Sequence, residues 1–552
     1  MKKKIILLFI ISLFLFLFSS CQSKKNVKKR VIFSISSDLS TLNPLYTFNL
    51  NEGRISELIY LGLVGHRWDE SKGDLKSYPL LAKYWSWSKD HKSIGIKLRP
   101  DLLWSDSTKF RVDDIVFSFD AYSDPQVKSR FYGTFDNFIT DKDAHINLKK
   151  TFDIISDDSL VIHFKKNSHP KLVDIDMPIL PKHVFKGIKR TNYSTSKINF
   201  NTVGTGPYLL KNWLKNEKIV LAPNKNSFLY NSAMIPELIF KIIPDYNSRI
   251  IQLQKGEIDF LDEVRADDIN KVKSFKNIKV VLQKSRTYDY VGWSNIDREK
   301  YRKSKVLKPN KFFGDPQVRR ALTMGIDRKI IIDEFLQGAA ELACSPVSPI
   351  FKYAVNKNVK PYKYDKTEAL KLLHKAGWKD SDEDGILDKQ GKPFSFTLYI
   401  PAGNPRRKFT SNIIKSNLKE LGIDVNVQSV EPSVFFDNMF QKKYDAWVAG
   451  WTVPIPLELK PFWHSDLEKN IANCVGYKNS KVDSLLDAIE KLSGEKEIVN
   501  DYYKIQEQIH KDEPVTFLFW IDNITAFNSK IKNIHVNPLG GIQHCWEWRL
   551  SD

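Results

Sequence analysis

The sequence predicts an α/β fold built from two or three globular units. The chain has 552 residues, more than one hydrophobic core usually supports. Alternating strand patterns and amphipathic helix patterns follow one another along most of its length. Apolar residues make up 42% of the chain and aromatic residues 12%, so it can bury a sizeable core.

The first half of the chain carries mainly strand patterns. A strand is predicted at residues 31–36, a helix at 52–63, and a hairpin whose second strand, 93–99, alternates buried and exposed residues. Gly204 and Gly206 interrupt a polar run, and we expect them to let two backbone segments pass close together.

Residues 313–338 predict a pair of short helices. Asp315 can cap the first helix, and Pro316 suits its first position. Asp327 can cap the second helix, which should end at Gly338. The expected buried stripe of the first helix is Val318, Ala321, Leu322 and Ile326, and the side chains expected to point away from it are Arg319, Arg320 and Arg328.

In the second half of the chain, one strand is expected to cross from one lobe to the other, and another strand is expected to end near the ligand. Two strands are predicted at residues 279–282 and 288–293, and the second should cross from one lobe to another as a hinge. A buried strand at residues 444–450 should deliver Trp451 to a loop, because α/β proteins place ligand contacts at strand ends.

The charge and the motifs argue against nucleic-acid binding and catalysis. The formal charge is +20, but most lysines are scattered singly among acidic residues, whereas a nucleic-acid groove needs clustered positive charge. No protease triad order, zinc motif or nucleotide loop is present in the sequence, and His183 lacks a partner at useful spacing. We therefore expect neither an enzyme nor a bound cofactor.

The N-terminus carries an export signal. Lysines at positions 2–4 precede a mainly apolar run at residues 5–18, which is too short to span a bilayer, since about 20 residues are needed. Ser19, Ser20 and Cys21 resemble a lipobox, although Phe18 replaces the usual Leu. Cys21 is thus the predicted lipidation site, and the alternative is ordinary cleavage with Cys21 incidental. The basic residues of segment 21–30 would add attraction to anionic lipids.

Two further patterns leave alternatives open. Cys344, Cys474 and Cys545 permit one disulfide and one free thiol, and the sequence does not choose the pair. Residues 380–391 begin like a calcium-binding loop, but the twelfth position is Gly391 instead of a bidentate Glu. A solvated acidic turn is the main interpretation there, and weak calcium binding is the alternative.

Several phrases resemble one family of transport proteins. Three sequence motifs are similar to those of bacterial extracellular solute-binding proteins of family 5. They are the residues around Asp315, Ala321 and Asp327, the Trp-rich segment 78–120, and residues 444–451. These are substrate-binding lipoproteins of peptide and nickel ABC importers. About eight such phrases follow the family order between residues 31 and 540.

The resemblance implies a periplasmic-binding-protein type II-like α/β fold, with two lobes of mixed β-sheets and an additional domain. The implied order is a signal peptide (1–20), a lipidated linker (21–30), lobe I in three parts (31–66, 203–287 and 515–552), the additional domain II (67–202) and lobe II (288–514).

The resemblance also implies where a ligand binds. Peptide-binding relatives carry an Asp that pairs with the peptide ammonium, but here Pro454 stands at that place, and Glu458 is the possible substitute. Arg406 and Arg407 are candidates to hold a ligand carboxylate. The predicted ligand-binding residues are Phe48, Trp293, Asn404, Arg406, Trp451 and Glu458, of which the three aromatic residues would form a wall.

The resulting prediction is a monomeric, exported lipoprotein on the periplasmic or outer side of a membrane. It would capture peptides by closing two lobes and deliver them to a permease, whose partner subunits would hydrolyse ATP. One alternative keeps the fold but binds a nickel chelate, haem or another small molecule. The other alternative is a sensor or adhesin that uses the same lobes without transport.

Overall fold

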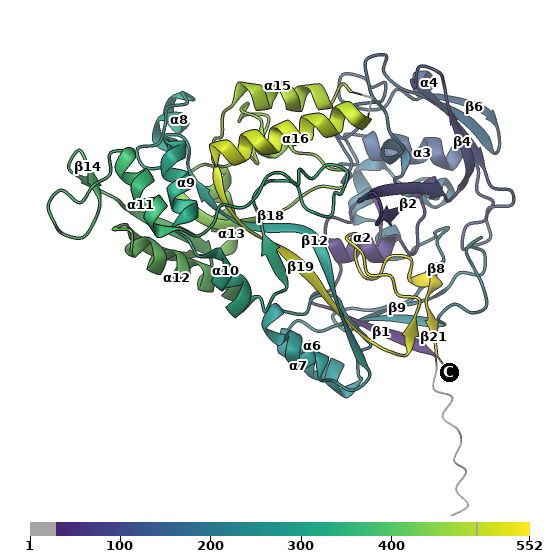
Figure 1. The fold of residues 1–552 in the computed structure, drawn as a ribbon. Helices are drawn as coiled ribbons and strands as arrows, with labels where there is room; N and C mark the ends of the chain where they lie inside the picture. The colour runs from purple at the N-terminus through teal and green to yellow at the C-terminus, as the bar shows by residue number, and fades with distance from the viewer. Residues whose placement is uncertain (1–28, 493–494, 552) are drawn as a thin grey trace, which may run out of the picture.

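An 11-stranded mixed sheet runs through the molecule and joins its two lobes (Figure 1). The computed structural model describes residues 29–492 and 495–551. The leader and Cys21 lie outside these described residues. The strand order is β17-β16-β18-β12-β19-β11-β1-β10-β9-β8, and β13 pairs with β19. These strands are β1 (Arg30–Ile35), β8 (Tyr208–Leu214), β9 (Lys218–Pro223), β10 (Glu237–Ile242), β11 (Phe260–Leu261), β12 (Ile278–Trp293), β13 (Ala340–Leu342), β16 (Ser395–Pro401), β17 (Asp424–Val430), β18 (Ala446–Thr452) and β19 (Val515–Asn528).

We use lobe I for strands β1 and β8–β11 with the helices packed on them, and lobe II for β16–β18 with theirs. Lobe I combines parallel β1–β10 pairing with antiparallel β9–β10 pairing. Lobe II combines parallel β16–β17 pairing with antiparallel β12–β18 pairing. The predicted α/β class with mixed sheets is confirmed.

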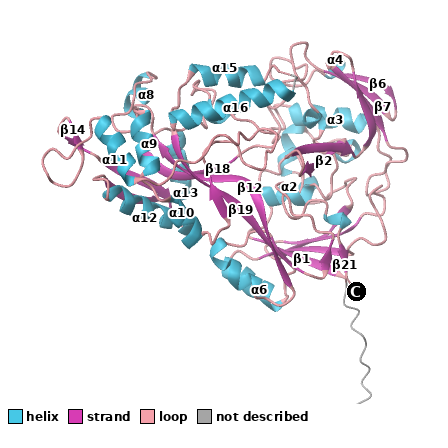
Figure 2. Cartoon of the chain, in the orientation of Figure 1, coloured by secondary structure: helices cyan, strands magenta, loops and turns pink. Residues whose placement is uncertain are grey.

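Helices cover both faces of the lobe II sheet (Figure 2). On β12, Val291 and Trp293 face one core cluster and Tyr288 and Tyr290 face another, because side chains alternate along a strand. The helices of this lobe are α9 (Pro316–Met324), α10 (Arg328–Ile330), the π-helical turn η5 (Ile331–Phe335), α11 (Lys366–Lys375), α12 (Pro405–Lys419), α13 (Pro432–Phe440), α14 (Lys460–Trp463), α15 (Ser480–Ile489) and α16 (Glu495–Asp512).

An additional domain has its own sheet and core. Its four strands run in the order β4-β5-β7-β6 and form a separate core cluster with α3. Its elements are β4 (Ala82–Trp87), β5 (Ser93–Leu98), α3 (Val112–Ser123), α4 (Leu148–Thr151), β6 (Phe152–Ser156), β7 (Ser159–His163) and α5 (Lys182–Phe185). Apart from short 3-10 turns, the remaining elements are α2 (Leu50–Ser56), β2 (Val64–Asp69), β3 (Asp74–Pro79), α6 (Tyr246–Lys255), α7 (Ile269–Lys273), α8 (Arg298–Ser304), β14 (Asp388–Lys389), β15 (Lys392–Pro393), β20 (Ile531–Lys532) and β21 (Arg549–Leu550).

The crossing strand β12 differs from the prediction. Residues 279–282 and 288–293 belong to one strand of 16 residues instead of two strands. The polar stretch between them stays paired to β19 on both sides of a bulge, where the register shifts between Gln283 and Thr287. Ser285 stabilises the bulge, because its hydroxyl donates to the carbonyl of Ile521 and accepts from the amide of Thr287. The bulge marks the place where the sheet passes from lobe I to lobe II.

The predicted helix pair is present, with two corrections. Asp315 caps α9 by accepting from the amide of Gln317 at 2.8 Å, and the predicted apolar stripe is buried. Arg319 and Arg328 do not point away, however, because only 3% and 4% of their surfaces are exposed. Both donate to buried backbone carbonyls, which keeps their guanidinium groups satisfied inside the lobe.

The two glycines at the lobe junction have the expected role. A Cβ atom on Gly204 would lie 1.9 Å from the carbonyl oxygen of Ile59, and one on Gly206 would lie 2.4 Å from that of Leu58. The amide of Gly206 donates to Ile59 at 2.7 Å, so the two segments approach at hydrogen-bond distance. Only glycine leaves room for this approach.

Candidate functional site

A buried ion cluster lies in lobe II next to the crossing strands. Asp289 of β12 is fully buried, and its carboxylate lies 2.8 Å from Arg406 Nε and 3.1 Å from Arg407 Nη2. Both arginines stand in the first turn of α12, which Asn404 caps by accepting from the amide of Arg407 at 3.0 Å. The two arginines are therefore engaged with a protein carboxylate instead of being free to hold a ligand.

The charge state of Asp289 follows from these contacts. Burial alone would raise the pKa of Asp289, but the guanidinium groups of Arg406 and Arg407 outweigh it and hold that pKa below its usual value. Gly450 lies directly opposite on β18, and a Cβ atom there would come within 2.4 Å of the Asp289 carboxylate. The close approach explains why glycine precedes Trp451.

Cavity B lies between the two lobes and has a volume of about 420 Å³. Asn404 and Arg406 line it from lobe II, so the structure brings these two predicted residues together. The facing wall comes from lobe I and from the end of β19, and its charged members are Arg249, Asp262, Glu263, Arg265, Asp267 and Asp522.

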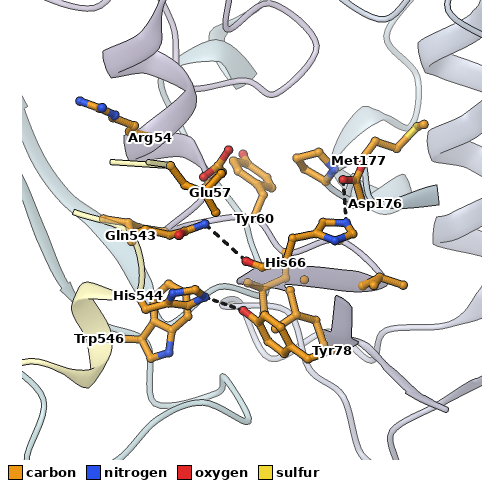
Figure 3. Close-up of a pocket in the computed structure, with 18 of the residues that line it drawn as sticks. Arg54, Glu57, Tyr60, His66, Tyr78, Asp176, Met177, Gln543, His544 and Trp546 are labelled. Atoms are coloured by element: carbon orange, nitrogen blue, oxygen red, sulfur yellow. Dashed lines mark hydrogen bonds and ion pairs between the residues drawn. The ribbon is translucent and has the colours of Figure 1, made fainter. Parts of the chain in front are cut away.

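Cavity A lies between lobe I and the additional domain and has a volume of about 340 Å³ (Figure 3). Its walls come from α2, β2, β3, residues 176–178 and residues 539–546. An ion pair of 2.8 Å links the two cavities, because Arg54 lines cavity A and its partner Asp262 lines cavity B. Both volumes are within the range of small-molecule sites.

Most polar side chains in cavity A have partners. His66 Nε2 lies 3.0 Å from Asp176, and Gln543 donates to the backbone carbonyl of His66 (Figure 3). Tyr78 and His544 share a hydrogen bond of 2.8 Å. Burial lowers the pKa of His544 to about 4, so this imidazole is neutral at pH 7.

Glu57 is the exception in cavity A. It follows α2 directly, and within the described residues its carboxylate has no hydrogen bond or ion pair. Surrounding protein atoms raise its pKa, while Arg130 and Arg54 act in the opposite direction. The side chain is solvent-accessible inside the cavity. Sequence reasoning missed Glu57, because nothing in the helix pattern distinguishes it from a surface carboxylate.

The loop that follows β18 is bonded to the crossing strand β12. Arg286, in the bulge of β12, donates to the carbonyl of Val453 at 2.6 Å. Burial lowers the pKa of Arg286, and the nearby charge of Arg54 lowers it further. The loop expected to contact a ligand is thus attached to β12 through Arg286.

Trp451 belongs to β18 and not to a loop, and it lies opposite Tyr288 of β12. Its half-buried indole packs against Phe440 and Phe462, with ring centroids 6.0 and 5.1 Å away. The only space it lines among the described cavities is about 10 Å³, too small for a solute. The residue lines neither cavity A nor cavity B.

The other predicted site residues are dispersed. Trp293 is fully buried, packs 4.9 Å from Phe313 and donates to the Thr516 hydroxyl, so the structure places it in the core instead of an aromatic wall. Phe48 is 72% exposed before α2 and lines neither cavity. Glu458 is exposed and also lies outside both cavities.

Several other sequence features can be placed. His183 has a partner after all, since it lies 2.7 Å from Asp106, 77 residues away. Cys344, Cys474 and Cys545 are all free thiols. Asp380, Asp382 and Asp384 are exposed, and their carboxylates lie within 4.8 Å of one another. Over residues 29–492 and 495–551, no helix combines the length and apolar character that crossing a membrane requires.

Two lobes joined by crossing strands, with a cavity between them, define the class of two-lobed solute-binding proteins. The sequence model for bacterial extracellular solute-binding proteins, family 5 Middle, matches residues 76–473. The chain belongs to this family, and the prediction made from its motifs is confirmed.

The chain is similar to relatives with different ligands. The oligopeptide-binding protein AppA of Bacillus subtilis strain 168 is 28% identical over 463 residues, covering 83% of this chain and 81% of that protein. Its structure in complex with a nonapeptide matches at 27% identity with a TM-score of 0.72, covering 95% and 99% of the two chains.

Two other relatives bind metal-containing solutes. NikZ from Campylobacter jejuni in complex with Ni(L-His) matches at 28% identity with a TM-score of 0.73, over 95% of this chain and 99% of that one. Heme-binding protein A of Haemophilus influenzae is 24% identical over 505 residues, covering 88% of this chain and 86% of that protein.

Proposed function

We propose that this chain is the substrate-binding lipoprotein of an ABC importer and captures peptides by closing its two lobes. The observation that carries the proposal is cavity B, which has one wall on each lobe and lies beside the crossing strands β12 and β19. Closure around such a cavity buries a ligand between the walls, and the ligand stabilises the closed state by its extra contacts there. Similarity to the peptide-bound AppA supports a peptide over other solutes.

The proposal includes no chemical step. The bound peptide passes unchanged to a membrane permease, and partner subunits hydrolyse ATP. The protein acts as an exported monomer, with lobe I formed by residues 31–66, 203–287 and 515–552, and lobe II by residues 288–514.

A nickel chelate is the second candidate ligand, because the similarity to NikZ equals that to AppA. Native mass spectrometry of the purified chain separates the candidates. The protein is offered a degenerate tripeptide library, nickel with L-histidine, and haemin in separate samples. Retained tripeptides support the proposal, and binding of nickel with histidine or of haemin without any peptide contradicts it.

We further propose that Cys21 carries the lipid anchor, on the strength of the small residues before it and the apolar run at residues 5–18. A Cys21→Ala variant should leave the membrane fraction for the soluble extract, whereas a Cys344→Ala variant should stay. Membrane association of Cys21→Ala after a high-salt wash would contradict the anchor.

A further inference from the structure

The start of β1 determines which surface of the protein lies next to the membrane. Arg30 is the first residue of β1 and follows Cys21, the proposed lipid anchor, by nine residues. Nine residues span at most about 30 Å when the chain is fully extended. With Cys21 held in the membrane, the end of lobe I that carries Arg30 therefore lies within about 30 Å of the bilayer.

Two turns surround the start of β1. The first joins α7 to β12, the second joins β19 to β20, and the two are in contact because the amide of Ser529 donates to the carbonyl of Asn277 at 2.8 Å. Lys530 Nζ lies 2.5 Å from Asp259, whose other carboxylate oxygen accepts from the amide of Ile32 in β1 at 3.0 Å. Both turns thus lie beside β1, and Figure 1 shows β1, β21 and α7 at the same lower end of the molecule.

Basic side chains gather at this end of lobe I. We call them the basic end, and they are Arg30, Lys276, Lys279, Lys530, Lys532 and Arg549. Lys279 lies opposite Phe527 just before the second turn, and Lys532 lies opposite Arg549 in the β20–β21 pair. Within the described chain, Arg30, Lys276 and Lys279 are exposed and have no carboxylate at ion-pair distance. Their charges are therefore available to a partner outside the chain.

Acidic side chains near the basic end are fewer, and most of them are paired. Asp259 is 2% exposed and is neutralised by Lys530. Glu237, opposite Arg30 on β10, lies 2.7 Å from Lys211 Nζ. Glu257 is exposed, and Asp552 ends the sequence after the last described residue. The basic end keeps an excess of positive charge, so it attracts an anionic surface.

The shape of the basic end suits a lipid surface better than a small anion. None of its six residues lines cavity A or cavity B, and they come from turns and strand ends instead of the walls of a pocket. Anionic headgroups attract each Lys or Arg that comes within a Debye length of them, about 8 Å at physiological ionic strength. The nine residues after Cys21 are short enough to keep the basic end close to such headgroups, and long enough to let it reach them.

We propose that the basic end of lobe I docks on anionic lipid headgroups beside the anchor. Lobe I then lies on the membrane, and lobe II, joined to it through β12 and β19, is the lobe that moves when the protein opens and closes. The inference rests on the proposed export and anchoring, because these bring the basic end to a bilayer. It does not depend on which solute the protein carries.

Vesicle binding of the lipid-free chain tests the docking. The Cys21→Ala protein should sediment with vesicles of phosphatidylcholine that contain about 30% phosphatidylglycerol, and not with phosphatidylcholine alone. Raising the salt from about 0.1 M to about 0.5 M should release it. Adding Lys276→Gln, Lys279→Gln and Lys532→Gln together should weaken the binding about tenfold or more, because three charges leave the contact surface.

Two control variants of the Cys21→Ala protein keep the outcome interpretable. Lys375→Gln, Lys415→Gln and Lys419→Gln remove the same charge from exposed positions on α11 and α12 of lobe II, and together they should weaken binding less than about twofold. The second variant replaces the four lysines of segment 21–30 by Gln and measures the attraction of that segment alone. The three substitutions in the basic end should still weaken binding in this second background.

Lysine acetylation of the natural, lipidated protein in anionic membranes gives an independent readout. Lys276, Lys279 and Lys532 should react several-fold more slowly than Lys375, Lys415 and Lys419, and detergent should remove the difference. Equal reaction rates in membranes would overturn the docking. A difference that persists in detergent would also overturn it, because the protein itself would then shield these lysines.

The vesicle experiment can contradict the docking without touching the proposed function. Equal losses for the substitutions in the basic end and in lobe II would show that overall charge, and not this surface, drives the binding. A loss that occurs only when segment 21–30 is neutralised would assign the attraction to that segment and would also overturn the docking. Failure of lipidation would instead appear as release of the natural protein from membranes, with vesicle binding of the Cys21→Ala protein unchanged.

Discussion

At the scale of single residues, buried charged side chains hold parts of lobe II together. Arg319 donates from Nε to the carbonyl of Glu513 at 2.8 Å, from Nη1 to that of Phe313 at 2.6 Å and from Nη2 to that of Asp512 at 2.7 Å. Burial lowers the pKa of Arg319 to about 10, so it remains charged at pH 7. One side chain thus joins the start of α9 to the end of α16.

Arg319→Met should destabilise the protein by about 3 kcal/mol or more, because buried carbonyls would lose their donors while the volume is nearly kept. Arg320→Met is the matched control. Arg320 donates to the carbonyl of Lys511, lies over the ring of Tyr362 and is more exposed, so its loss should cost about 1 kcal/mol or less. Urea unfolding of both variants measures the difference, and equal losses would refute the role given to Arg319.

Glu513 should make stability depend on pH. Burial raises its pKa to about 8, despite the opposing effects of Arg328, Thr323, Arg319 and Arg320, and His510 lies 4.0 Å away. Between its unfolded value near 4.5 and about 8, the folded state holds a proton that the unfolded state has released. The contribution of Glu513 to stability is therefore complete below pH 4.5 and is lost as the pH rises through 8.

Thermal unfolding of the natural protein and of Glu513→Gln should show this. The amide can still accept from Thr323, whose hydroxyl donates to Glu513 at 2.9 Å, but it cannot ionise. The melting temperature of the variant should fall less between pH 5 and pH 8. Parallel curves for the two proteins would exclude a titrating Glu513.

The candidate site shows which residue-level features the sequence could predict. Arg406 and Asn404, which the sequence suggested as ligand-binding residues, line cavity B at the start of α12, and their role in binding stays a prediction. Asp289 was not expected as the partner of Arg406, since 117 residues separate the two. Glu57 was missed for the same reason, because its surroundings come from segments far apart in the chain.

At the scale of elements, the sequence correctly predicted those helices and strands whose formation depends on residues close to one another in the chain. The cap and stripe of α9 and the alternation of β5 needed no distant partner, and both are as expected. The extent of β12 depends on pairing with β19, more than 200 residues later, so the polar stretch between residues 283 and 287 was wrongly read as a break. Another non-local pairing, that of β18 with β12, places Trp451 in a strand instead of a loop.

Gly204→Ala should destabilise the lobe junction by about 2 kcal/mol or more, because its Cβ would overlap a backbone carbonyl that has little room to move. Gly95→Ala in β5 is the control. There the nearest atom is the Ser86 hydroxyl at 3.3 Å, and a small shift of that side chain is enough. Urea midpoints of the two variants would settle the comparison, and a larger loss at Gly95 would contradict the close approach at Gly204.

At the scale of the whole molecule, the proposed closing motion has a measurable size. Addition of the degenerate tripeptide library should lower the radius of gyration in small-angle scattering, because the walls of cavity B would come together. The same concentration of free glycine serves as control and should leave the radius unchanged. Peptide retained in mass spectrometry without any change in scattering would exclude lobe closure as the capture mechanism.

The pairing of β12 with β19 determines how strongly the sheet resists the closing of the two lobes. The two strands stay paired from Ile278 and Asn528 in lobe I to Gly292 and Val515 in lobe II, with register shifts between Gln283 and Thr287 and between Asp289 and Tyr290. A two-stranded ribbon of this kind can twist while it keeps its hydrogen bonds. It therefore resists the rotation of one lobe relative to the other elastically. The resistance of this ribbon to twisting would decide how much contact energy each ligand must supply, and therefore which ligands are bound at low concentration.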